Sequence, residues 1–375
     1  MRFVLVGPAA PLRGGIAIDN DALAQALRQA GHTVEQVSFC RLYPALLFPG
    51  RSQYDIGKNY EHSQAQHCID SINPLSWWRA ARTISRLQPQ MVTFQWWHPF
   101  FAPCYATIMT RLRRTCPNTS RILISHNTRP HEPISGQDTA LRLVVRRCDG
   151  VVVRSRSEYE LITTVAPGTA VRIANYPLLG TSQVLPDREE AQHRLGVSGR
   201  VLLFFGYIRK YKGLDLLLRA LALVPVDLGV TLLVAGEFYE PVESYRALGR
   251  ALGIAERIRI IDRYIGEREW PELFAATDAL VLPYVAASQS MSITLAYAFG
   301  KPVIVTRVGG LAEEVEEGRT GLIAEPEPAA LAAAIQRLYN ELLPSPYQAH
   351  IQAKRRGLGW DPFLRLLEGW QDRNP

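Results

Sequence analysis

Three cations lie in a loop that follows a run of apolar residues. The sequence VLLFFGYIRKYKG covers residues 201–213, and its loop carries Arg209, Lys210 and Lys212 before Gly213 and an amphipathic helical pattern. At the carboxyl end of a buried parallel strand, such cations can neutralise a departing diphosphate group. We predict this role for Arg209 and Lys212, whereas Lys210 fits better as a solvated loop lysine.

A histidine occupies the same kind of position in the first half of the chain. His126 follows the apolar run ILIS at 122–125, so it should lie where a strand ends. A histidine there can hydrogen-bond a substrate hydroxyl or a phosphate, although a core histidine with satisfied hydrogen bonds is nearly as good an interpretation. The eight histidines never show a metal spacing such as H-E-x-x-H, so we predict no metal site.

Two glycines precede the first helical pattern. Gly14 and Gly15 would let the backbone approach a ligand, and a helix N-terminus favours an anion such as a diphosphate. A plain strand–helix turn is the alternative. The nearby sequence Asp19-Asn20-Asp21 has the D-x-D spacing of metal-dependent sugar transferases, but it lies in the first helical turns instead of at a strand end. We therefore predict a structural role for it, in which the carboxylates suit the helix dipole.

An aromatic cluster follows another expected strand. The sequence VTFQWWHPFFAP at 92–103 contains Trp96, Trp97 and His98 where the strand should end. These side chains could form an apolar wall for an acceptor, and burial in the core is an equally good interpretation.

The segment 73–87 has the pattern of a two-sided helix. One face carries the apolar residues Trp77, Ala80, Ile84 and Leu87. The opposite face carries Arg79, Arg82 and Arg86, with Trp78 at its edge. A basic face with an aromatic rim can lie on an anionic membrane, and a solvated surface helix is a slightly better supported alternative.

The positive charge lies in the first half of the chain. Residues 1–180 hold 20 Lys+Arg against 11 Asp+Glu, a balance of +9, and residues 181–375 hold 22 against 24, a balance of −2, which together give +7. This asymmetry indicates an anionic partner or a simple drift in composition. A membrane surface is the better partner, because no nucleic-acid-binding module is recognisable.

Apolar β-type runs alternate with helical patterns along the 375 residues. In the first half the runs cover 2–7, 34–39, 91–97, 121–127, 150–155 and 171–175. In the second half they cover 201–206, 230–236, 258–262, 279–284, 303–306 and 321–325. Strands that are apolar on both faces imply parallel sheets covered by helices. We predict an α/β chain of two doubly wound domains that face each other across a cleft, joined near the proline-rich segment 175–191.

Several classes of protein are disfavoured. The first strand is followed by no G-x-G-x-x-G and the chain has no P-loop, which argues against a dehydrogenase or kinase. No apolar run reaches the roughly 20 residues that cross a bilayer, and the N-terminal sequence reads as a strand and a loop. The five cysteines show no paired spacing, which is typical of a reducing compartment. We expect a cytoplasmic protein that can also be peripheral on the inner face of the membrane.

These residues resemble the family-4 glycosyltransferases, which are retaining enzymes of the GT-B fold. The resemblance rests on Gly14–Gly15, SHN at 125–127, Lys212–Gly213 and, above all, AFGKPVIVTRVGGLAEEVEEGRTGLI at 298–323. It implies domains at 1–180 and 181–355, with a helix at 356–375 that returns to the first domain. It also implies transfer of a hexosyl-type sugar from a nucleoside diphosphate sugar to an acceptor hydroxyl with retention, without a metal or other cofactor. His126 would contact the donor sugar, and the acceptor would be a glycan or a lipid-linked molecule in bacterial-type cell-surface synthesis.

Two departures from the family pattern affect donor binding. The positions of the two family glutamates hold Ala287 and Leu295, and the position of the family arginine holds Tyr207, with Arg209 two residues later. The diphosphate of a UDP- or GDP-linked donor could instead lie on backbone N–H groups and on polar side chains at a helix start. The side chains that we predict for this role are Ser288, Gln289, Ser290 and Ser292. How the ribose is held stays open.

The loss of both glutamates also permits a second interpretation. The chain could be a non-catalytic module of the same fold that serves as a binding or scaffolding subunit. We favour the enzyme, because Arg209, Lys212, His126 and the glycine pair are all retained.

Overall fold

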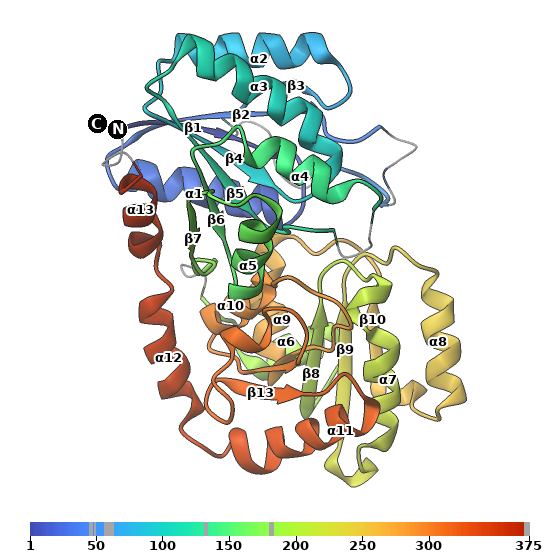
Figure 1. The fold of residues 1–375 in the computed structure, drawn as a ribbon. Coiled ribbons are helices and arrows are strands. Elements are labelled where there is room, and N and C mark those ends of the chain that lie inside the picture. The colour runs from blue at the N-terminus through green and yellow to red at the C-terminus, as the bar shows by residue number, and fades with distance from the viewer. Residues whose placement is uncertain (45–47, 49, 56–63, 131–133, 180–183, 371–375) are drawn as a thin grey trace. The chain divides into compact units, whose positions relative to one another are not determined.

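The computed structural model describes residues 1–44, 48, 50–55, 64–130, 134–179 and 184–370. The chain forms two compact units, Met1–Asn175 with Trp360–Pro375, and Tyr176–Gly359. The domain boundary expected between residues 180 and 181 falls at residues outside the described ranges, as do residues 371–375 of the expected C-terminal helix. Each unit is a parallel sheet covered by helices (Figure 1).

The first unit contains a seven-stranded sheet in the order β3-β2-β1-β4-β5-β6-β7. Its strands are β1 (Arg2–Val6), β2 (Thr33–Arg41), β3 (Gln66–Asp70), β4 (Met91–Trp96), β5 (Ser120–Ser125), β6 (Gly150–Val153) and β7 (Val171–Ile173). All of its neighbouring strands are parallel. The strand order reverses between β1 and β4, and ligands of such sheets bind outside the carboxyl ends of the strands at this point.

Helices cover both faces of this sheet because its central strands are apolar on both sides. Val4 and Phe94 contribute to one core, in which α2 and α3 pack. Phe3 and Leu5 contribute to the opposite core, together with α1 and the C-terminal helix α13. The helices of this unit are α1 (Gly15–Gln29), α2 (Pro74–Arg86), α3 (Ala102–Thr115), α4 (Gln137–Val145), α5 (Arg156–Val165) and α13 (Trp360–Glu368). The C-terminal helix therefore belongs to the unit that contains the N-terminus, as predicted.

The second unit contains a six-stranded sheet in the order β10-β9-β8-β11-β12-β13. Its strands are β8 (Arg200–Phe205), β9 (Val230–Ala235), β10 (Ile258–Ile261), β11 (Ala279–Leu282), β12 (Val303–Thr306) and β13 (Gly321–Ala324), again all parallel. Its α-helices are α6 (Arg188–Leu195), α7 (Leu214–Leu223), α8 (Val242–Ala251), α9 (Trp270–Ala276), α10 (Met291–Ala298), α11 (Pro328–Arg337) and α12 (Tyr347–Gly357). Here the strand order reverses between β8 and β11. The prediction of two doubly wound domains is confirmed.

In the described part of the chain, no helix is both long enough and apolar enough to cross a membrane.

Candidate functional site

The loops after β8 and β11 meet where the strand order of the second unit reverses. Gly213 makes this approach possible, because it has a φ of 68° and a Cβ atom at this position would lie 2.0 Å from the carbonyl oxygen of Pro283. The backbone N–H of Val285 donates to the carbonyl of Tyr211 at 2.8 Å, which joins the two loops directly. Only glycine accepts both this backbone conformation and the close contact with Pro283, so Gly213 fixes the end of the cationic loop.

The turn after β12 joins the same edge of the sheet. Gly309 has a φ of 50°, and a Cβ atom there would lie 1.8 Å from the carbonyl oxygen of Ala287. The backbone N–H of Gly310 donates to the carbonyl of Ser288 at 2.9 Å. The loop that starts α10 is thus held between the turn at 309–310 on one side and the cationic loop on the other.

Lys212 is the buried cation of this edge. It ends the short 3-10 helix Lys210–Lys212, its residue is 8% exposed, and its Nζ lies 5.5 Å from the centre of the Tyr284 ring. Burial lowers the pKa of the Lys212 ammonium. Within the described residues no carboxylate lies within 4.0 Å of this ammonium, and a buried cation without a counter-charge is costly. The surroundings of Lys212 therefore suit a bound anion.

The other two cations of the loop have different environments. The Arg209 guanidinium lies over the ring of Tyr239, with 4.5 Å between its Cζ and the ring centre, and Tyr207 packs against the same ring. Lys210 is exposed. The structure thus separates Lys212, which is buried, from Arg209, which is stacked, and from Lys210, which points into solvent. The phosphate-binding roles of Arg209 and Lys212 stay predictions.

The predicted donor-binding residues surround the N-terminus of α10. Ser290 is the N-cap, and its hydroxyl accepts from the backbone N–H of Ser292 at 3.4 Å. The Gln289 amide donates to the carbonyl of Gly310 at 3.3 Å, so this side chain also braces the loop. Ser288 and Ser292 are half-buried. Burial raises the pKa of Tyr284 to about 12, and this phenol lies 3.5 Å from the Ser290 hydroxyl.

His126 belongs to a hydrogen-bonded chain of buried side chains in the first unit. The Asn20 amide donates to the carbonyl of Pro8 at 3.0 Å, so its oxygen accepts from the Gln95 amide at 2.9 Å. The Gln95 oxygen is then left as the acceptor for Nε2 of His126, at 2.7 Å. The backbone carbonyl thus fixes the direction of the chain and assigns the proton of the ring to Nε2.

A buried ion pair adjoins this chain. Nη2 of Arg154 lies 3.5 Å from Oδ2 of Asp19, and both side chains are at most 2% exposed. Burial, opposed by the Arg154 charge, raises the pKa of the Asp19 carboxyl. Burial and the same Arg154 charge lower the pKa of His126 well below its ordinary value, so the ring is neutral at pH 7. A neutral His126 can act by hydrogen bonding and not by charge.

The structure corrects our explanation of Asp19-Asn20-Asp21. Helix α1 begins at Gly15, so its first turn contains no acidic residue and these side chains start one turn further along. Asp19 pairs with Arg154, and Asp21 accepts from the backbone N–H of Ala10 and from the Gln36 amide. These residues have contacts with other elements of the unit, and those contacts explain their presence in α1 better than the helix dipole does.

The loop that follows β5 is held by a second buried carboxylate. Glu158 accepts from the backbone N–H and the hydroxyl of Thr128, at 3.0 and 2.9 Å, and from the backbone N–H of Arg154 at 3.1 Å. The sequence patterns did not predict that Glu158, Asp19, Gln95 and Arg154 belong to one network. The available signal was a polar residue interrupting or ending an apolar strand, as in VTFQWW and VVVR.

The other predicted residues of the first unit have distinct surroundings. Gly14 is the N-cap of α1, with a φ of 115°, and no side chain caps that helix.

The aromatic cluster after β4 is partly buried. Trp96 is 1% exposed and packs in the core, which excludes its side chain from an open acceptor wall. Trp97 is half-buried and donates to the Tyr43 hydroxyl at 2.9 Å. The His98 ring accepts from the backbone N–H of Phe100 at 3.2 Å. Acceptor contacts of Trp97 and His98, and anion binding at Gly14–Gly15, stay predictions.

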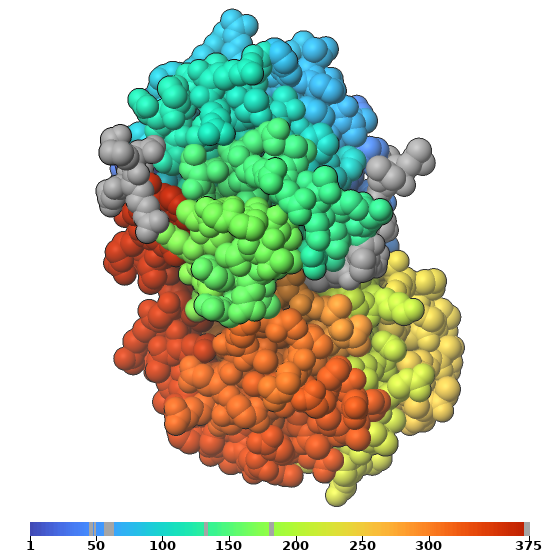
Figure 2. Space-filling view, viewed as in Figure 1, coloured from blue at the N-terminus to red at the C-terminus, as the bar shows by residue number. Residues whose placement is uncertain are grey.

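Helix α2 has the two faces that its sequence pattern predicts. It begins after Asn73, whose side chain accepts from the backbone N–H of Leu75 at 3.0 Å. Ala80 and Ile84 are buried. The exposed face carries the residues predicted for membrane docking, Trp78, Arg79, Arg82 and Arg86. Residues 74–115, drawn in light blue to teal, form part of the surface of the first unit (Figure 2). Docking itself stays a prediction.

Within the described residues, no three His, Cys, Asp or Glu side chains are grouped closely enough to hold a metal ion.

Comparison with known proteins identifies relatives of the chain. Residues 199–341 match the family model of glycosyl transferases group 1. The chain is 30% identical over 189 residues to D-inositol 3-phosphate glycosyltransferase of Corynebacterium diphtheriae, covering 48% of this chain and 43% of the relative. It is 28% identical over 254 residues to D-inositol 3-phosphate glycosyltransferase 1 of Catenulispora acidiphila, covering 62% and 57%. The chain thus spans about half the length of these curated relatives.

Solved structures with the same fold cover the whole chain. HepE of Anabaena, in complex with UDP and glucose, has a TM-score of 0.77 at 16% identity and covers 98% of both chains. Sucrose-phosphate synthase of Thermosynechococcus elongatus has a TM-score of 0.73 at 18% identity and covers 99% of this chain and 98% of its own. The chain as a whole therefore has the GT-B fold of these solved structures, and its residues 199–341 are similar to glycosyl transferases group 1.

Proposed function

We propose that the protein transfers a hexosyl-type sugar from a nucleoside diphosphate sugar to an acceptor hydroxyl, with retention and without a metal ion. The observation that carries this proposal is Lys212, a buried ammonium without a carboxylate partner among the described residues. It lies where loops of the second unit meet at the carboxyl edge of the sheet. The glycosyltransferase names of the relatives and the UDP bound to HepE support the same conclusion.

In the proposed reaction the second unit stabilises the leaving diphosphate. The Lys212 ammonium and the Arg209 guanidinium would pair with its oxygens, and the backbone N–H groups at the start of α10 would add hydrogen bonds. Ser288 and Ser292 would contribute hydroxyls, while Gln289 and Ser290 hold the loop in place. The bond from the anomeric carbon to the diphosphate oxygen breaks, and a bond from that carbon to the acceptor oxygen forms on the same face of the sugar. The proton of the acceptor hydroxyl passes to the departing diphosphate.

In the first unit, His126 is proposed to contact the donor sugar. Its neutral ring and fixed tautomer favour a directional hydrogen bond over a charge interaction. Gln95 and Asn20 would act as positioning residues for that ring. We propose that the acceptor is a glycan or a lipid-linked molecule of a bacterial-type cell-surface pathway.

A thermal-shift panel of nucleoside diphosphates tests the donor site. We expect UDP or GDP to raise the melting temperature, because a ligand that binds only the native state stabilises it by about 2.7 kcal/mol at 100 times its Kd. EDTA should leave this shift unchanged, and Lys212→Ala should reduce it more than Lys210→Ala. A shift that disappears with EDTA would contradict a metal-free site.

The same panel separates the enzyme from a non-catalytic subunit. Ala287 and Leu295, which replace the family carboxylates, are the residues that favour a subunit without activity. If no nucleoside diphosphate shifts the melting temperature and no donor is consumed, the scaffolding function would be preferred. Stabilisation by a nucleotide together with sugar transfer would exclude it.

We further propose that the protein is peripheral on an anionic membrane through the exposed face of α2. Replacing Arg79, Arg82 and Arg86 with glutamine should strongly weaken sedimentation with anionic liposomes, most clearly at low salt. Each basic residue near such a surface contributes on the order of 1 kcal/mol, so the total loss is about 3 kcal/mol.

A matched control removes three exposed arginines of the second unit, Arg219, Arg319 and Arg356. This control has the same net charge as the α2 variant but keeps the proposed face. Equal sedimentation of the two variants at low ionic strength would rule out α2 as the docking helix.

A further inference from the structure

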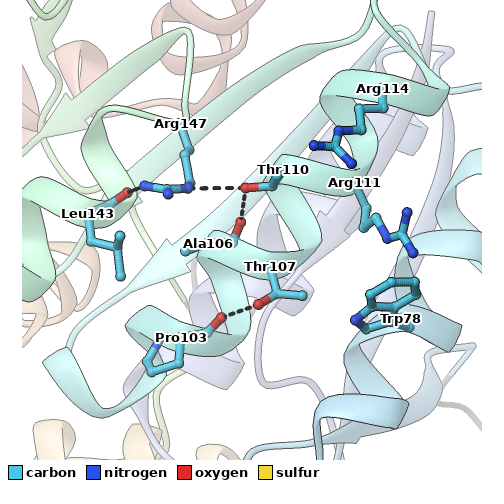
Figure 3. A pocket seen from close by; sticks show the side chains of 9 residues that line it. All are labelled: Trp78, Pro103, Ala106, Thr107, Thr110, Arg111, Arg114, Leu143 and Arg147. Carbon is cyan, nitrogen blue, oxygen red and sulfur yellow. Dashed lines mark hydrogen bonds between the residues drawn. The ribbon is translucent and has the colours of Figure 1, made fainter.

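A pocket outside the candidate donor site opens on the first unit. It has a volume of about 390 Å³ and lies between α2, α3 and the segment that follows α4 (Figure 3). Arg111 and Arg114 of α3, Arg147 after α4, and Trp78 of α2 contribute to its walls. Its volume is in the range of roughly 300–1,000 Å³ that is typical of small-molecule sites.

Two of these guanidinium groups are held in fixed positions. The Arg147 Nε donates to the Thr110 hydroxyl at 3.1 Å, and its Nη1 donates to the carbonyl of Leu143 at 2.6 Å. The Arg111 guanidinium stacks on Trp78, with 3.2 Å between its Cζ and the ring centre. Figure 3 shows Arg111 against the Trp78 ring and Arg147 bonded to Thr110 and to Leu143. Arg111 and Arg147 are therefore ordered before any ligand binds.

Within the described residues, these arginines have no carboxylate partner, unlike several other arginines of the protein. Arg129, Arg307 and Arg337 each pair with a carboxylate at 2.6–3.0 Å. Among the described residues, none of the pocket arginines has a carboxylate within 4.0 Å. The sequences of α2 and α3 contain six arginines and not one Asp or Glu. Fixed like charges without a partner repel one another, so a bound anion would stabilise this cluster.

Apolar side chains next to the pocket indicate the source of that anion. Trp78, at the pocket wall, is 53% exposed, and Leu75, one helical turn earlier, is 68% exposed. Ile72, just before the helix, is 48% exposed. Exposed apolar groups beside ordered cations match an amphiphile better than a water-soluble phosphate, because the apolar groups can enter the acyl region.

We infer that this pocket binds the phosphate of an anionic lipid headgroup through Arg111, Arg114 and Arg147. The inference rests on the proposed membrane docking of α2 and adds a specific headgroup site to it. General surface charge would respond to any anionic lipid, whereas three guanidinium groups around one cavity favour a phosphate, which accepts several charge-assisted hydrogen bonds at once.

The test compares two kinds of vesicle with the same surface potential. One contains phosphatidylglycerol and the other contains oleate, whose carboxylate supplies charge without phosphate, both in a neutral lipid that has no phosphate, such as digalactosyldiacylglycerol. We expect the wild-type protein to bind the phosphatidylglycerol vesicles roughly tenfold more tightly, an effect comparable to one or two additional basic contacts. The variant Arg111→Gln/Arg114→Gln should lose this preference.

Its matched control is Arg113→Gln/Arg146→Gln, which removes two exposed charges next to the pocket but leaves the pocket walls intact. The control should bind both vesicles more weakly and keep the preference for phosphatidylglycerol. If the wild type shows no preference, or if both double variants lose it equally, the headgroup site does not exist. Melting temperatures of both variants near that of the wild type show that the fold is retained.

Further measurements test other ligands of the pocket and separate a failure of the headgroup site from a failure of membrane docking. Stabilisation by soluble glycerol 3-phosphate without any preference between vesicles would assign the pocket to a water-soluble phosphate and overturn the lipid inference. Displacement of the bound vesicles by RNA at equal phosphate concentration would overturn it in favour of a nucleic acid. If the α2 variant Arg79→Gln/Arg82→Gln/Arg86→Gln loses vesicle binding while the wild type shows no headgroup preference, docking is correct and only the pocket is wrong. If nothing binds vesicles, both proposals fail, and the nucleotide panel still tests sugar transfer independently.

Discussion

Replacing Lys212 with alanine should lower kcat for sugar transfer by roughly 10²–10³-fold. This is the usual effect of removing one ordered group that stabilises charge in a transition state. Lys212 is buried between the loops that follow β8 and β11, so its ammonium is already desolvated and positioned before the donor arrives. Burial lowers the pKa of this ammonium, and a bound diphosphate would favour its charged form.

Lys210→Ala is the control for this experiment. The two lysines carry the same charge in the same 3-10 helix, but Lys210 is exposed. Its replacement should change the rate by less than twofold. The measurement is a sugar-transfer assay with the donor identified by the nucleotide panel. Equal rates for Lys212→Ala and the wild type would show that the leaving group does not lie at this loop.

The same assay examines the shifted arginine. Arg209→Ala should resemble Lys212→Ala if Arg209 performs the role of the family arginine whose position holds Tyr207. The guanidinium is stacked on Tyr239, which fixes its direction without a carboxylate. A rate loss for Lys212→Ala alone would restrict the diphosphate contact to the lysine.

Much of the fold could be predicted because its strands are apolar on both faces. Each predicted run contains a strand, and the central strands β1, β4 and β5 are buried along nearly their whole length. Strand β3 (Gln66–Asp70) was not predicted, because the edge sequence QHCID is polar and only partly buried and so lacks the apolar signal. Residue composition and periodicity reveal a strand through its buried apolar side chains, and an edge strand has few of them.

The second unit's candidate site was the more predictable one, because its residues are close in the sequence. Lys212 and Gly213 are adjacent, and one stretch of the chain contains Ser288 to Ser292. The aromatic partners Tyr239 and Tyr284 were missed, since they come from the loops after two other strands. A tyrosine after an apolar run is as typical of a core as of a site, so the sequence offers no means to choose.

The polar network of the first unit shows the limit of sequence patterns most clearly. Asp19 and Arg154 are 135 positions apart by their numbers, and only the order of the strands in the sheet brings them together. The pattern around Asp19 predicts a carboxylate in the first helical turns that suits the helix dipole. Burial reverses that interpretation, because a carboxylate with 1% exposure needs a counter-charge.

The second large effect expected is on stability. Replacing Arg154 with methionine should lower the free energy of unfolding by about 3–5 kcal/mol, the usual cost when one partner of a buried ion pair is removed. The substitution leaves the Asp19 carboxylate without the charge now 3.5 Å away. It also removes hydrogen bonds from Nη1 to the carbonyls of Ala174 and Asn175, at 3.4 and 3.2 Å. Urea unfolding of the whole chain measures the loss.

An exposed arginine two residues later supplies the matched control. Arg156 pairs with Glu160 at 3.1 Å, but both side chains are about two-thirds exposed, at 67% and 65%. Arg156→Met should therefore cost less than about 1 kcal/mol. If both variants lost the same stability, the buried position of Arg154 would not be the cause.

The double variant Asp19→Asn/Arg154→Met identifies which group causes the loss. An amide at position 19 needs no counter-charge, so the double variant should be more stable than Arg154→Met alone, although each change removes a native group.

The stability of Arg154→Met should also depend on pH, because the same Asp19 carboxyl titrates. Without Arg154 the pKa of Asp19 in the folded state rises further above its pKa in the unfolded chain, so the folded state binds the proton more tightly. The variant therefore gains stability as the pH falls toward the unfolded pKa, near 4. The deficit of Arg154→Met relative to the wild type should then shrink between pH 7 and pH 5. A deficit that is constant over this range, together with a double variant no more stable than Arg154→Met, would assign the loss to the hydrogen bonds of Arg154 and not to the charge of Asp19.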